Sequence, residues 1–277
     1  MLDKDISSED YKKFCIFLEH QCGIVLGDNK QYLVKSRLTP LMNKFEAASL
    51  SEVVNRSMSI TERQLRAAVV DAMTTNETLW FRDSYPFEVL IKDIFPQYDN
   101  KFKTVKIWSA AASSGQEPYS IAMCSAEHQQ RKMNACKVQV LGTDISPSML
   151  DLCKSATYDS LALARGLSPQ RKQQFFEPAE QAGYMKLKPN VTQMVSFRQM
   201  NLLDSYSLLG KFDIIFCRNV LIYFSAQNKA KILKQFAQAL NPDGYLFLGA
   251  SESISGLSED FVMQRCNPGI VYRLKNK

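Results

Sequence analysis

Residues 105–123 constrain the fold of this chain more than any other stretch. They begin with β-branched and aromatic residues, continue through six small residues at 110–115, and place Pro118 where a helix would begin. Proline suits the first turn of a helix, because its missing N–H would have no partner there. The pattern predicts a strand, a tight turn whose bare backbone a ligand can approach, and a helix whose free N–H groups face that ligand.

An acid in this turn limits what the ligand can be. Glu117 lies where a dinucleotide-binding fold would hold pyrophosphate, and the glycine pattern of phosphate-cradling turns is missing. A carboxylate repels phosphate but suits a ligand with hydroxyl and ammonium groups, and S-adenosylmethionine is such a ligand. An ordinary turn with a solvated glutamate is the alternative interpretation.

Further along the chain, apolar strands alternate with helices, which is typical of a doubly wound parallel sheet. Residues 138–142 form the second predicted strand and lead to Asp144, and residues 214–217 form a later strand that is followed by Arg218 and Asn219. Open α/β sheets bind ligands at the carboxyl ends of their strands. We expect Asp144 to bind ribose hydroxyls, with a role at the start of the following helix as the alternative.

One stretch rich in proline and glycine interrupts this alternation. Within it, residues 184–188 and 192–197 alternate enough to predict two short strands, so a small antiparallel subdomain is expected at about 158–195. A disordered loop of that length would be unusual inside a compact domain. Near the end of the chain, residues 262–265 and 270–274 predict a terminal hairpin.

The first part of the chain, residues 1–75, is predicted to be a separate helical domain. Ser7 starts a possible capping box, Gly23 ends the first helical pattern, and Thr61 is expected to cap a later helix. Pro40 falls inside the second helical pattern and should kink or split that helix.

The second helical pattern carries regularly spaced basic residues. Three basic residues recur every seven positions, which predicts a solvated helix face: Lys30, Arg37 and Lys44.

Residues 73–82 change from polar to aromatic to basic and are interpreted as a connector rather than a core element. The predicted domains are therefore 1–75, a linker at 76–90 that contributes to the cofactor site, and 91–277.

Composition excludes several classes of protein. The 277 residues contain no apolar run near the ~18 residues that a membrane span needs, and the N-terminus lacks the features of a signal peptide. Seven cysteines without a C-x-x-C pair argue against a disulfide framework or a zinc site, and His20 and His128 are predicted to lie on helix surfaces. A net charge of +6 without a basic run does not indicate nucleic acid. These features favour a cytoplasmic protein without a metal centre.

Several ordered motifs resemble those of the CheR family of chemotaxis receptor methyltransferases, over nearly the whole chain. These motifs are Thr74-Thr75-Asn76-x-Thr78-x-x-Phe81-Arg82, residues 109–120 (SAAASSGQEPYS), Asp144-Ile145, Asn201-Leu202 and residues 216–224 (FCRNVLIYF). The resemblance implies an α/β class I methyltransferase (Rossmann-like) domain that depends on S-adenosylmethionine, with an N-terminal all-helical domain and a small antiparallel β insert. It also implies methyl transfer from S-adenosylmethionine to glutamate side chains of chemoreceptors, giving γ-glutamyl methyl esters and S-adenosylhomocysteine.

The same resemblance implies roles for individual residues. It implies that the cofactor is contacted by Asn76, Thr78, Arg82, Glu117, Asp144, Asn201, Leu202, Asn219 and Val220. It implies that the substrate glutamate is faced by Arg82, Arg218 and Tyr223, as the catalytic residues. A glutamate side chain, with a pKa of about 4.3, is already ionised at pH 7, so no general base is required.

Some residues depart from the family pattern, and these departures affect how the protein is expected to bind a chemoreceptor. Gln116 stands where relatives often have glutamate, and the second helix carries only Arg37 where an arginine-rich face occurs in better-known members. The insert has a short turn near Gly183. We therefore expect the protein to act as a monomer on the cytoplasmic helical domain of a chemoreceptor, with a weak or absent tether to a receptor C-terminal pentapeptide, and without nucleic-acid binding or membrane insertion.

Other classes of protein compete with this interpretation. One is a class I methyltransferase that acts on a small molecule or RNA, although the exposed aromatics of an RNA groove are not evident. Another is a non-catalytic module that senses S-adenosylmethionine, which would not need Arg82, Arg218 and Tyr223. A dehydrogenase is disfavoured by Glu117 and by the missing glycine pattern.

Overall fold

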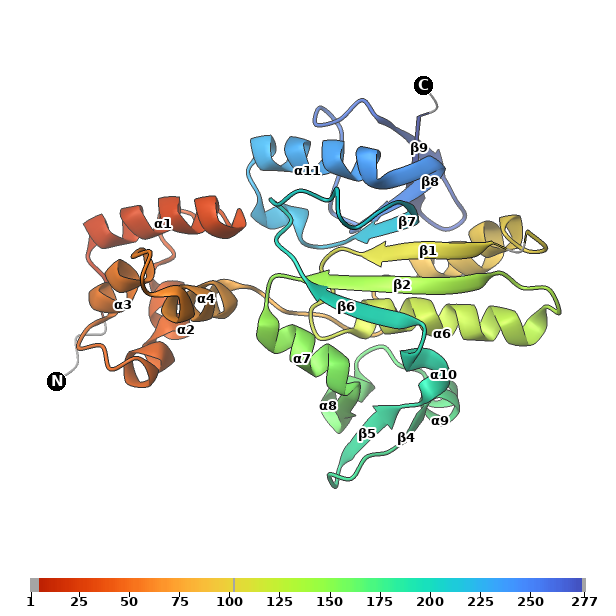
Figure 1. Cartoon of the computed structure of the whole chain (residues 1–277), viewed down its shortest axis with the longest axis horizontal. Coiled ribbons are helices and arrows are strands. Elements are labelled where there is room, and N and C mark those ends of the chain that lie inside the picture. The colour runs from red at the N-terminus through yellow and green to blue at the C-terminus, as the bar shows by residue number, and fades with distance from the viewer. Residues whose placement is uncertain (1–4, 102, 276–277) are drawn as a thin grey trace. The chain divides into compact units, whose positions relative to one another are not determined.

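A computed structural model describes residues 5–101 and 103–275 of the chain. The chain divides into two compact units, which are described separately (Figure 1): Met1–Thr75 with Tyr223–Lys229, and Asn76–Ile222 with Ala230–Lys277. None of the helices in the described ranges is long and apolar enough to cross a membrane.

The first unit is built from helices. They are α1 (Ser8–Cys22), α2 (Gln31–Lys44), α3 (Leu50–Ser57) and α4 (Arg63–Met73). The Ser7 hydroxyl accepts a hydrogen bond from the Asp10 N–H at 3.0 Å, and Gly23 ends α1 at φ 78°, so both of these predicted helix ends are confirmed. Positive φ at such an end favours glycine, which has no Cβ to clash.

Two predictions for this unit differ from the structure. Pro40 does not split α2, which runs through it from Gln31 to Lys44, because one missing N–H leaves the neighbouring turns bonded; a kink at Pro40 stays a prediction. Thr61 does not cap α4, which begins at Arg63 with no side-chain cap; its hydroxyl instead lies 2.9 Å from that of Ser59.

Arg37 also departs from its predicted solvated face. Its guanidinium donates hydrogen bonds to the carbonyls of Met73 and Thr74 and to the Thr75 hydroxyl, at 2.6–2.9 Å. These carbonyls lie at the carboxyl end of α4, where a helix leaves its last acceptors unpaired and favours a cation. Arg37 therefore ties α2 to α4, while Lys30 and Lys44 are exposed as predicted.

The second unit contains a seven-stranded sheet in the order β6-β2-β1-β7-β8-β10-β9 (Figure 1). Its strands are β1 (Thr104–Ser109), β2 (Lys137–Asp144), β6 (Val195–Gln199), β7 (Phe212–Cys217), β8 (Leu240–Leu248), β9 (Phe261–Arg265) and β10 (Ile270–Leu274). The pairs from β6 to β8 are parallel, and β10 is antiparallel to both β8 and β9. The predicted parallel sheet and terminal hairpin are confirmed.

Helices cover both faces of this sheet. They are α5 (Tyr85–Val89), a π-helical turn η1 (Leu90–Ile94), a 3-10 turn η2 (Phe95–Gln97), α6 (Gln116–Arg131), α7 (Pro147–Ser155), η3 (Leu221–Tyr223) and α11 (Ala226–Ala239). On one face, Ile107 belongs to the same buried cluster as Ile121 of α6. On the other, Trp108 packs edge-on against Phe236 of α11, with ring centroids 5.3 Å apart. The alternation of neighbours along β1 explains why both faces are apolar.

A smaller antiparallel sheet is inserted between β2 and β6. It has the order β3-β5-β4, and its elements are β3 (Thr157–Asp159), α8 (Ser160–Ala164), α9 (Pro169–Phe175), β4 (Phe176–Pro178), β5 (Tyr184–Leu187) and α10 (Pro189–Thr192). The strand predicted at 184–188 is confirmed. The one predicted at 192–197 is wrong for the insert, because Val195–Gln199 pairs in parallel with β2 in the main sheet.

Candidate active site at the carboxyl ends of the strands

The small-residue turn after β1 is fastened to the neighbouring strand β2. The Ser113 N–H donates to Asp144 Oδ2 at 2.7 Å, and Asp144 Oδ1 accepts the Ser146 N–H at 3.0 Å. Ser146, rather than Asp144, caps α7 through its hydroxyl. Gly115 ends the turn at φ 97°, and a Cβ there would lie 2.8 Å from the Tyr158 hydroxyl. Asp144 thus joins the turns that follow β1 and β2.

Glu117, in the first turn of α6, is held from two sides. Its Oε1 accepts a hydrogen bond from the Ser109 hydroxyl at 2.8 Å, and its Oε2 lies 3.0 Å from Nη1 of Arg218. Burial raises the pKa of the Glu117 carboxyl, although Arg218 and Ser109 both favour its charged form. The solvated glutamate of the alternative interpretation is therefore excluded.

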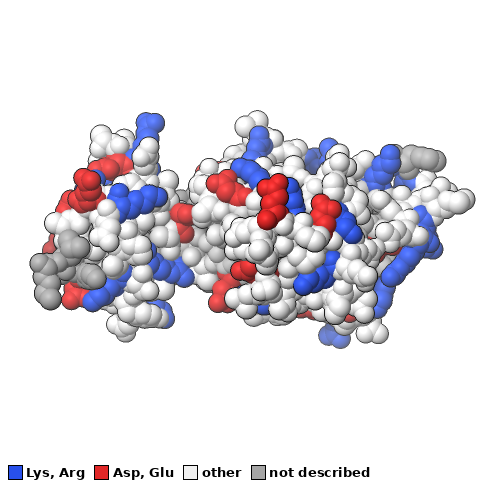
Figure 2. All heavy atoms as spheres, turned by 90° about the horizontal axis from the view of Figure 1, so that it is seen from below, with Lys and Arg blue, Asp and Glu red and all other residues white. Residues whose placement is uncertain are grey.

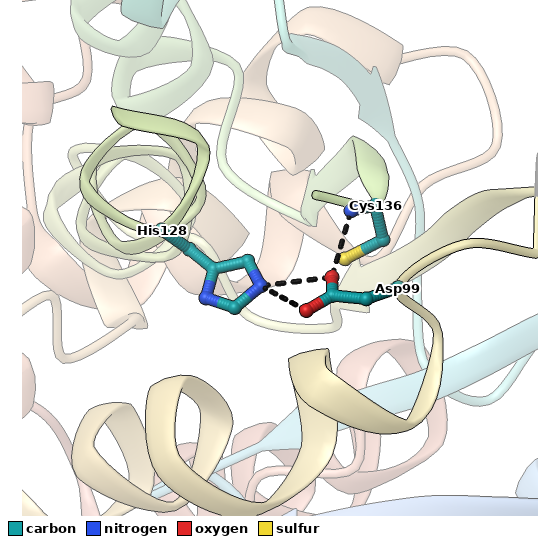
Figure 3. Close-up of side chains that lie close together, drawn as sticks. All are labelled: Asp99, His128 and Cys136. Carbon is teal, nitrogen blue, oxygen red and sulfur yellow. Dashed lines mark hydrogen bonds and ion pairs between the residues drawn. The ribbon is translucent and has the colours of Figure 1, made fainter. Parts of the chain in front are cut away.

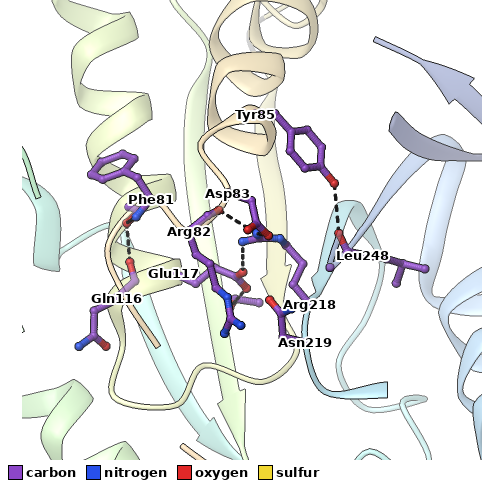
Figure 4. Close-up of polar contacts among 12 residues, drawn as sticks. Phe81, Arg82, Asp83, Tyr85, Gln116, Glu117, Arg218, Asn219 and Leu248 are labelled. Atoms are coloured by element: carbon purple, nitrogen blue, oxygen red, sulfur yellow. Dashed lines mark hydrogen bonds and ion pairs between the residues drawn. The ribbon is translucent and has the colours of Figure 1, made fainter. Parts of the chain in front are cut away.

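Arg218 is the centre of a charged network at this edge of the sheet (Figure 4). Its side chain is 1% exposed and reaches from the end of β7 to Glu117 and Asp83. Nη2 donates to Asp83 Oδ2 at 2.6 Å and to the Arg82 carbonyl at 2.8 Å. Arg218 therefore holds the turn at 81–84 against α6.

That turn has an unusual backbone. Phe81, Asp83 and Ser84 all have positive φ, at 51°, 64° and 51°. Left-handed backbone is costly for residues other than glycine, and such residues cluster at functional sites. The Arg82 side chain is half-buried, and its Nη1 donates to the Glu77 carbonyl at 3.2 Å.

Trp80 and Phe81 are core residues, so the prediction of a connector at 73–82 is wrong for them. Trp80 packs edge-on against Tyr158 and Phe176, with ring centroids 4.9 and 5.5 Å apart. The backbone N–H of Trp80 donates to the Arg165 carbonyl at 3.0 Å. An aromatic run after polar residues resembles a linker in sequence, and only the contacts with the insert show that it is buried.

The remaining predicted residues lie in the segment between α4 and α5, after β6 and in η3. The Asn76 carbonyl accepts a hydrogen bond from the Ser113 hydroxyl at 2.8 Å, which brings Asn76 to the β1 turn, and Thr78 is half-buried nearby in sequence. Asn201 and Leu202 follow β6, where Asn201 Oδ1 accepts the Leu203 N–H at 3.0 Å. Tyr223 lies in the segment that clusters with the first unit.

Gln116, the departure from the family pattern, has a local role. It is buried, and its Oε1 accepts a hydrogen bond from the Ser114 hydroxyl at 2.8 Å. Its carbonyl accepts the Ser120 hydroxyl, which in turn accepts the Phe81 N–H at 3.1 Å. The amide therefore helps to shape the turn through neutral hydrogen bonds.

Glu252 is the functional candidate that the sequence reasoning missed. It lies shortly after the end of β8, and it is buried against the loop that carries Asn219 and Val220. A related signal was present, since an acid at the carboxyl end of an apolar strand had been used to select Asp144, and Glu252 follows the apolar strand β8 after three residues. Asp83 was missed as well, and no pattern in the sequence distinguishes it.

A different cluster lies at the opposite, amino-terminal edge of the sheet (Figure 3). His128 Nε2 lies 2.9 and 3.0 Å from the two carboxylate oxygens of Asp99, which also accepts the Cys136 N–H at 3.0 Å. His128 is buried, so the prediction of a surface histidine is wrong for it, whereas His20 is exposed. In the described part of the chain, this is the one group whose ligand atoms lie close enough for a metal ion, within 4.8 Å. Its hydrogen bonds explain it as a structural tie that joins the turn after η2 and the residue before β2 to α6.

This sheet order, with a small-residue turn after β1, an acid in the following helix and another at the end of β2, is the arrangement of class I methyltransferases. Residues 76–270 match the family model described as CheR methyltransferase, SAM binding domain, and residues 9–74 match CheR methyltransferase, all-alpha domain. The chain belongs to the CheR methyltransferase family. The predicted family, fold class and cofactor are confirmed.

Named relatives agree with the family. The chain is 60% identical over 271 residues to the chemotaxis protein methyltransferase of Vibrio parahaemolyticus, covering 98% of each chain. It is 60% identical, at the same coverage, to chemotaxis protein methyltransferase 1 of Vibrio cholerae. The chemotaxis protein methyltransferase of Salmonella typhimurium is 33% identical over 266 residues, which cover 94% of this chain and 88% of that one.

The residues at this edge fit S-adenosylmethionine. Asn219 Oδ1 is buried without a hydrogen-bond partner among the described residues. Buried acceptors are nearly always paired, so this oxygen indicates a donor supplied by a ligand, and the cofactor carries an ammonium group and hydroxyls. The acids of the site would repel a phosphate, which the cofactor lacks.

Proposed function

We propose that this methyltransferase transfers the methyl group of S-adenosylmethionine to glutamate side chains of chemoreceptors, forming γ-glutamyl methyl esters. The observation that carries the proposal is the 60% identity to a chemotaxis protein methyltransferase over 98% of both chains. On the face that Figure 2 draws, Lys and Arg side chains lie among Asp and Glu on the left and in the middle of the view and prevail at its right end.

The chemistry requires positioning more than proton transfer. When bound, S-adenosylmethionine supplies a methyl group activated by a positively charged sulfur. The acceptor glutamate is ionised at neutral pH, so no residue of the chain has to act as a base. The protein then contributes by orienting the two reactants and excluding water, and alignment alone can supply about 7–11 kcal/mol of a reaction barrier.

The two arginines divide this work. Both terminal nitrogens of Arg218 are bonded, to Glu117, Asp83 and the Arg82 carbonyl, so Arg218 positions the site. Arg82 has a half-buried side chain with one hydrogen bond to a carbonyl, which leaves it able to orient the substrate carboxylate. Tyr223 would complete the wall on the substrate side.

The cofactor roles follow from the strand ends. Asp144 would bind the ribose hydroxyls, Glu117 the ribose or methionine side, and Asn219 with Val220 the part near the methyl group. Asn201 and Leu202 would flank the adenine, and Asn76, Thr78 and Arg82 would approach from the segment before α5.

The partner is the cytoplasmic helical domain of a chemoreceptor, and the enzyme works in the cytoplasm as a monomer. The turn near Gly183 connects β4 and β5 of the insert, with Gly183 at φ 83°. This turn is short, so we expect a receptor C-terminal pentapeptide to bind weakly or not at all. Measurable affinity for such a peptide in calorimetry would refute this expectation.

A labelling experiment tests the proposal. The protein is incubated with S-adenosylmethionine tritiated in its methyl group and a chemoreceptor cytoplasmic fragment, and the fragment is then treated with base. Label released as volatile methanol identifies a carboxyl methyl ester, as proposed. Label that resists base would mean methylation of nitrogen or carbon, and absence of label with intact cofactor binding would indicate a different substrate or a sensor.

A further inference from the structure

The loop after β7 is held by a single buried carboxylate. Glu252 Oε2 accepts the backbone N–H groups of Gly249 and Asn219, each at 2.7 Å. Its Oε1 accepts those of Val220 at 3.0 Å and Ile222 at 3.3 Å. A carboxylate offers about four lone-pair sites, and these hydrogen bonds use them.

The backbone at this place needs such support. Asn219 has φ 58°, in the left-handed region, which is uncommon for residues other than glycine although asparagine adopts it more readily than most. The loop also runs very close to the end of β8, because a Cβ on Gly249 would lie 2.7 Å from Asn219 Nδ2 and 2.8 Å from Glu252 Oε2. Hydrogen bonds from N–H groups to a charged acceptor are about twice as strong as neutral ones, so Glu252 can stabilise this conformation.

The held conformation has a consequence for the side chain of Asn219. Its Oδ1 is buried and has no hydrogen-bond partner among the described residues, although the backbone N–H of the same residue is bonded to Glu252. The backbone is therefore satisfied within the protein, while the side-chain acceptor remains for a ligand.

We propose that Glu252 is a positioning residue for S-adenosylmethionine, which acts by fixing the backbone at Asn219 and Val220 so that the Asn219 side chain meets the cofactor. Glu252 itself is occupied by four backbone N–H groups and does not contact the cofactor. The proposal rests on cofactor binding and is independent of which substrate accepts the methyl group.

Calorimetry with S-adenosylmethionine and, separately, S-adenosylhomocysteine tests this role in the Glu252→Gln variant of the full chain. The amide NH2 would face N–H donors, so two hydrogen bonds are lost with little change in shape. Leaving buried donors unpaired costs enough to weaken binding on the order of tenfold or more. Because the effect acts through geometry, both ligands should lose affinity by a similar factor, and the KM for S-adenosylmethionine should rise correspondingly.

Asp213→Asn is the matched control. Asp213 is a buried carboxylate at the other end of β7, and it also accepts a backbone N–H, from Lys106 at 2.9 Å. This variant should lower the thermal midpoint Tm and leave both Kd values unchanged. A Glu252→Gln variant that lowers Tm in the same way with unchanged Kd values would overturn the proposal, as would weakened binding of S-adenosylmethionine alone, which would indicate a charge effect.

Gly249→Ala provides a second route if Glu252→Gln does not fold. It keeps the carboxylate but places a Cβ within 3 Å of Asn219 and Glu252, which must displace the same loop. We expect a similar loss of affinity for both ligands. Unchanged affinity in a folded Gly249→Ala protein would contradict the role of this loop geometry.

Discussion

The two ends of strand β7 carry buried charge in different ways. At the amino end, Asp213 accepts hydrogen bonds from the Lys106 N–H, the Asn241 amide and the Lys103 ammonium, at 2.7–2.9 Å. At the carboxyl end, Arg218 faces two acids, but its Nε has no hydrogen-bond partner among the described residues.

The difference separates a structural tie from a ligand site. Buried polar groups are nearly always paired in native proteins. The acid at the amino end is satisfied from within the fold, whereas Arg218 Nε and Asn219 Oδ1 at the carboxyl end find no hydrogen-bond partner within residues 5–101 and 103–275. The carboxyl end is also where the turn at 81–84 has strained backbone. We infer that this end of the sheet is completed by the cofactor and substrate.

The largest expected effect is that of Arg218→Ala. It leaves Glu117 and Asp83 without their shared cation, and breaking a buried pair costs about 3–5 kcal/mol. Urea unfolding should show this loss, and calorimetry should show loss of cofactor binding. Arg273→Ala is the control, since its pair with Asp243 is about half exposed and worth about 0–1 kcal/mol. If the two variants lose similar amounts of free energy of unfolding, the contrast between the two ends of β7 is contradicted.

Arg82→Ala should have a smaller effect on stability and a large effect on turnover. Its side chain makes one hydrogen bond, to the Glu77 carbonyl, so the free energy of unfolding should change little. Loss of substrate orientation can cost about 10²-fold in rate, so kcat should fall by about that factor. Steady-state kinetics on a receptor fragment measures this, and unchanged turnover would reject the role of Arg82.

Glu117 and Asp99 lie at opposite ends of the parallel strands, and their contributions to stability should change with pH in opposite directions. Burial raises the pKa of Glu117 above its ordinary 4.5, so its contribution to stability is full below pH 4.5 and falls as pH rises through the folded pKa. For Asp99, burial opposes ionisation, but hydrogen bonds from His128 and the Cys136 N–H outweigh it and lower its pKa. The contribution of Asp99 is present above its ordinary 3.8 and is lost as pH falls through its folded pKa.

Unfolding measured across pH in Glu117→Gln and Asp99→Asn checks these signs. In the unchanged protein, the free energy of unfolding should decline above pH 4.5 as Glu117 ionises. The Glu117→Gln variant has no group to ionise there, so it should not show this decline. In the unchanged protein, stability should fall at acid pH as Asp99 becomes protonated, and the Asp99→Asn variant should not show this fall. Parallel pH profiles for the two variants would show that the edges do not differ in this respect.

The smallest expected effect concerns support of the 81–84 turn from the insert. The Arg171 guanidinium lies 3.7 Å from the centre of the Phe81 ring and makes two hydrogen bonds to Glu127, at 2.6 and 3.0 Å. Arg171→Ala should lower stability by about 1–2 kcal/mol, because the cation–π contact and the ion pair are both lost. Urea unfolding measures the change, with Lys275→Ala as the control, since its partner Glu259 is 95% exposed. A loss no larger than the control's would show that the insert does not support this turn.

Local patterns in the sequence were enough to predict the fold class and much of the site. The strand, small-residue turn and helix around Glu117 require only neighbouring residues, and so does the acid after the second strand. Parallel strands bring their carboxyl ends to one edge, so Asp144, Glu117 and Arg218 could be assigned to one site before any contact was known.

Contacts between distant segments could not be predicted in this way. Arg218 was expected to face the substrate, and only its contacts with Asp83 and Glu117, 135 and 101 residues away, reveal a residue that holds the site together. Trp80 read as part of a connector until its contacts with the insert placed it in the core.

Residue order thus specified the elements and the edge at which ligands bind, because periodicity and turn chemistry act over a few neighbours. The tertiary structure decided which polar groups are paired within the protein and which are left for a ligand. Glu252 shows the physical reason: its role depends on four backbone N–H groups that come together only when the ends of β7 and β8 lie side by side.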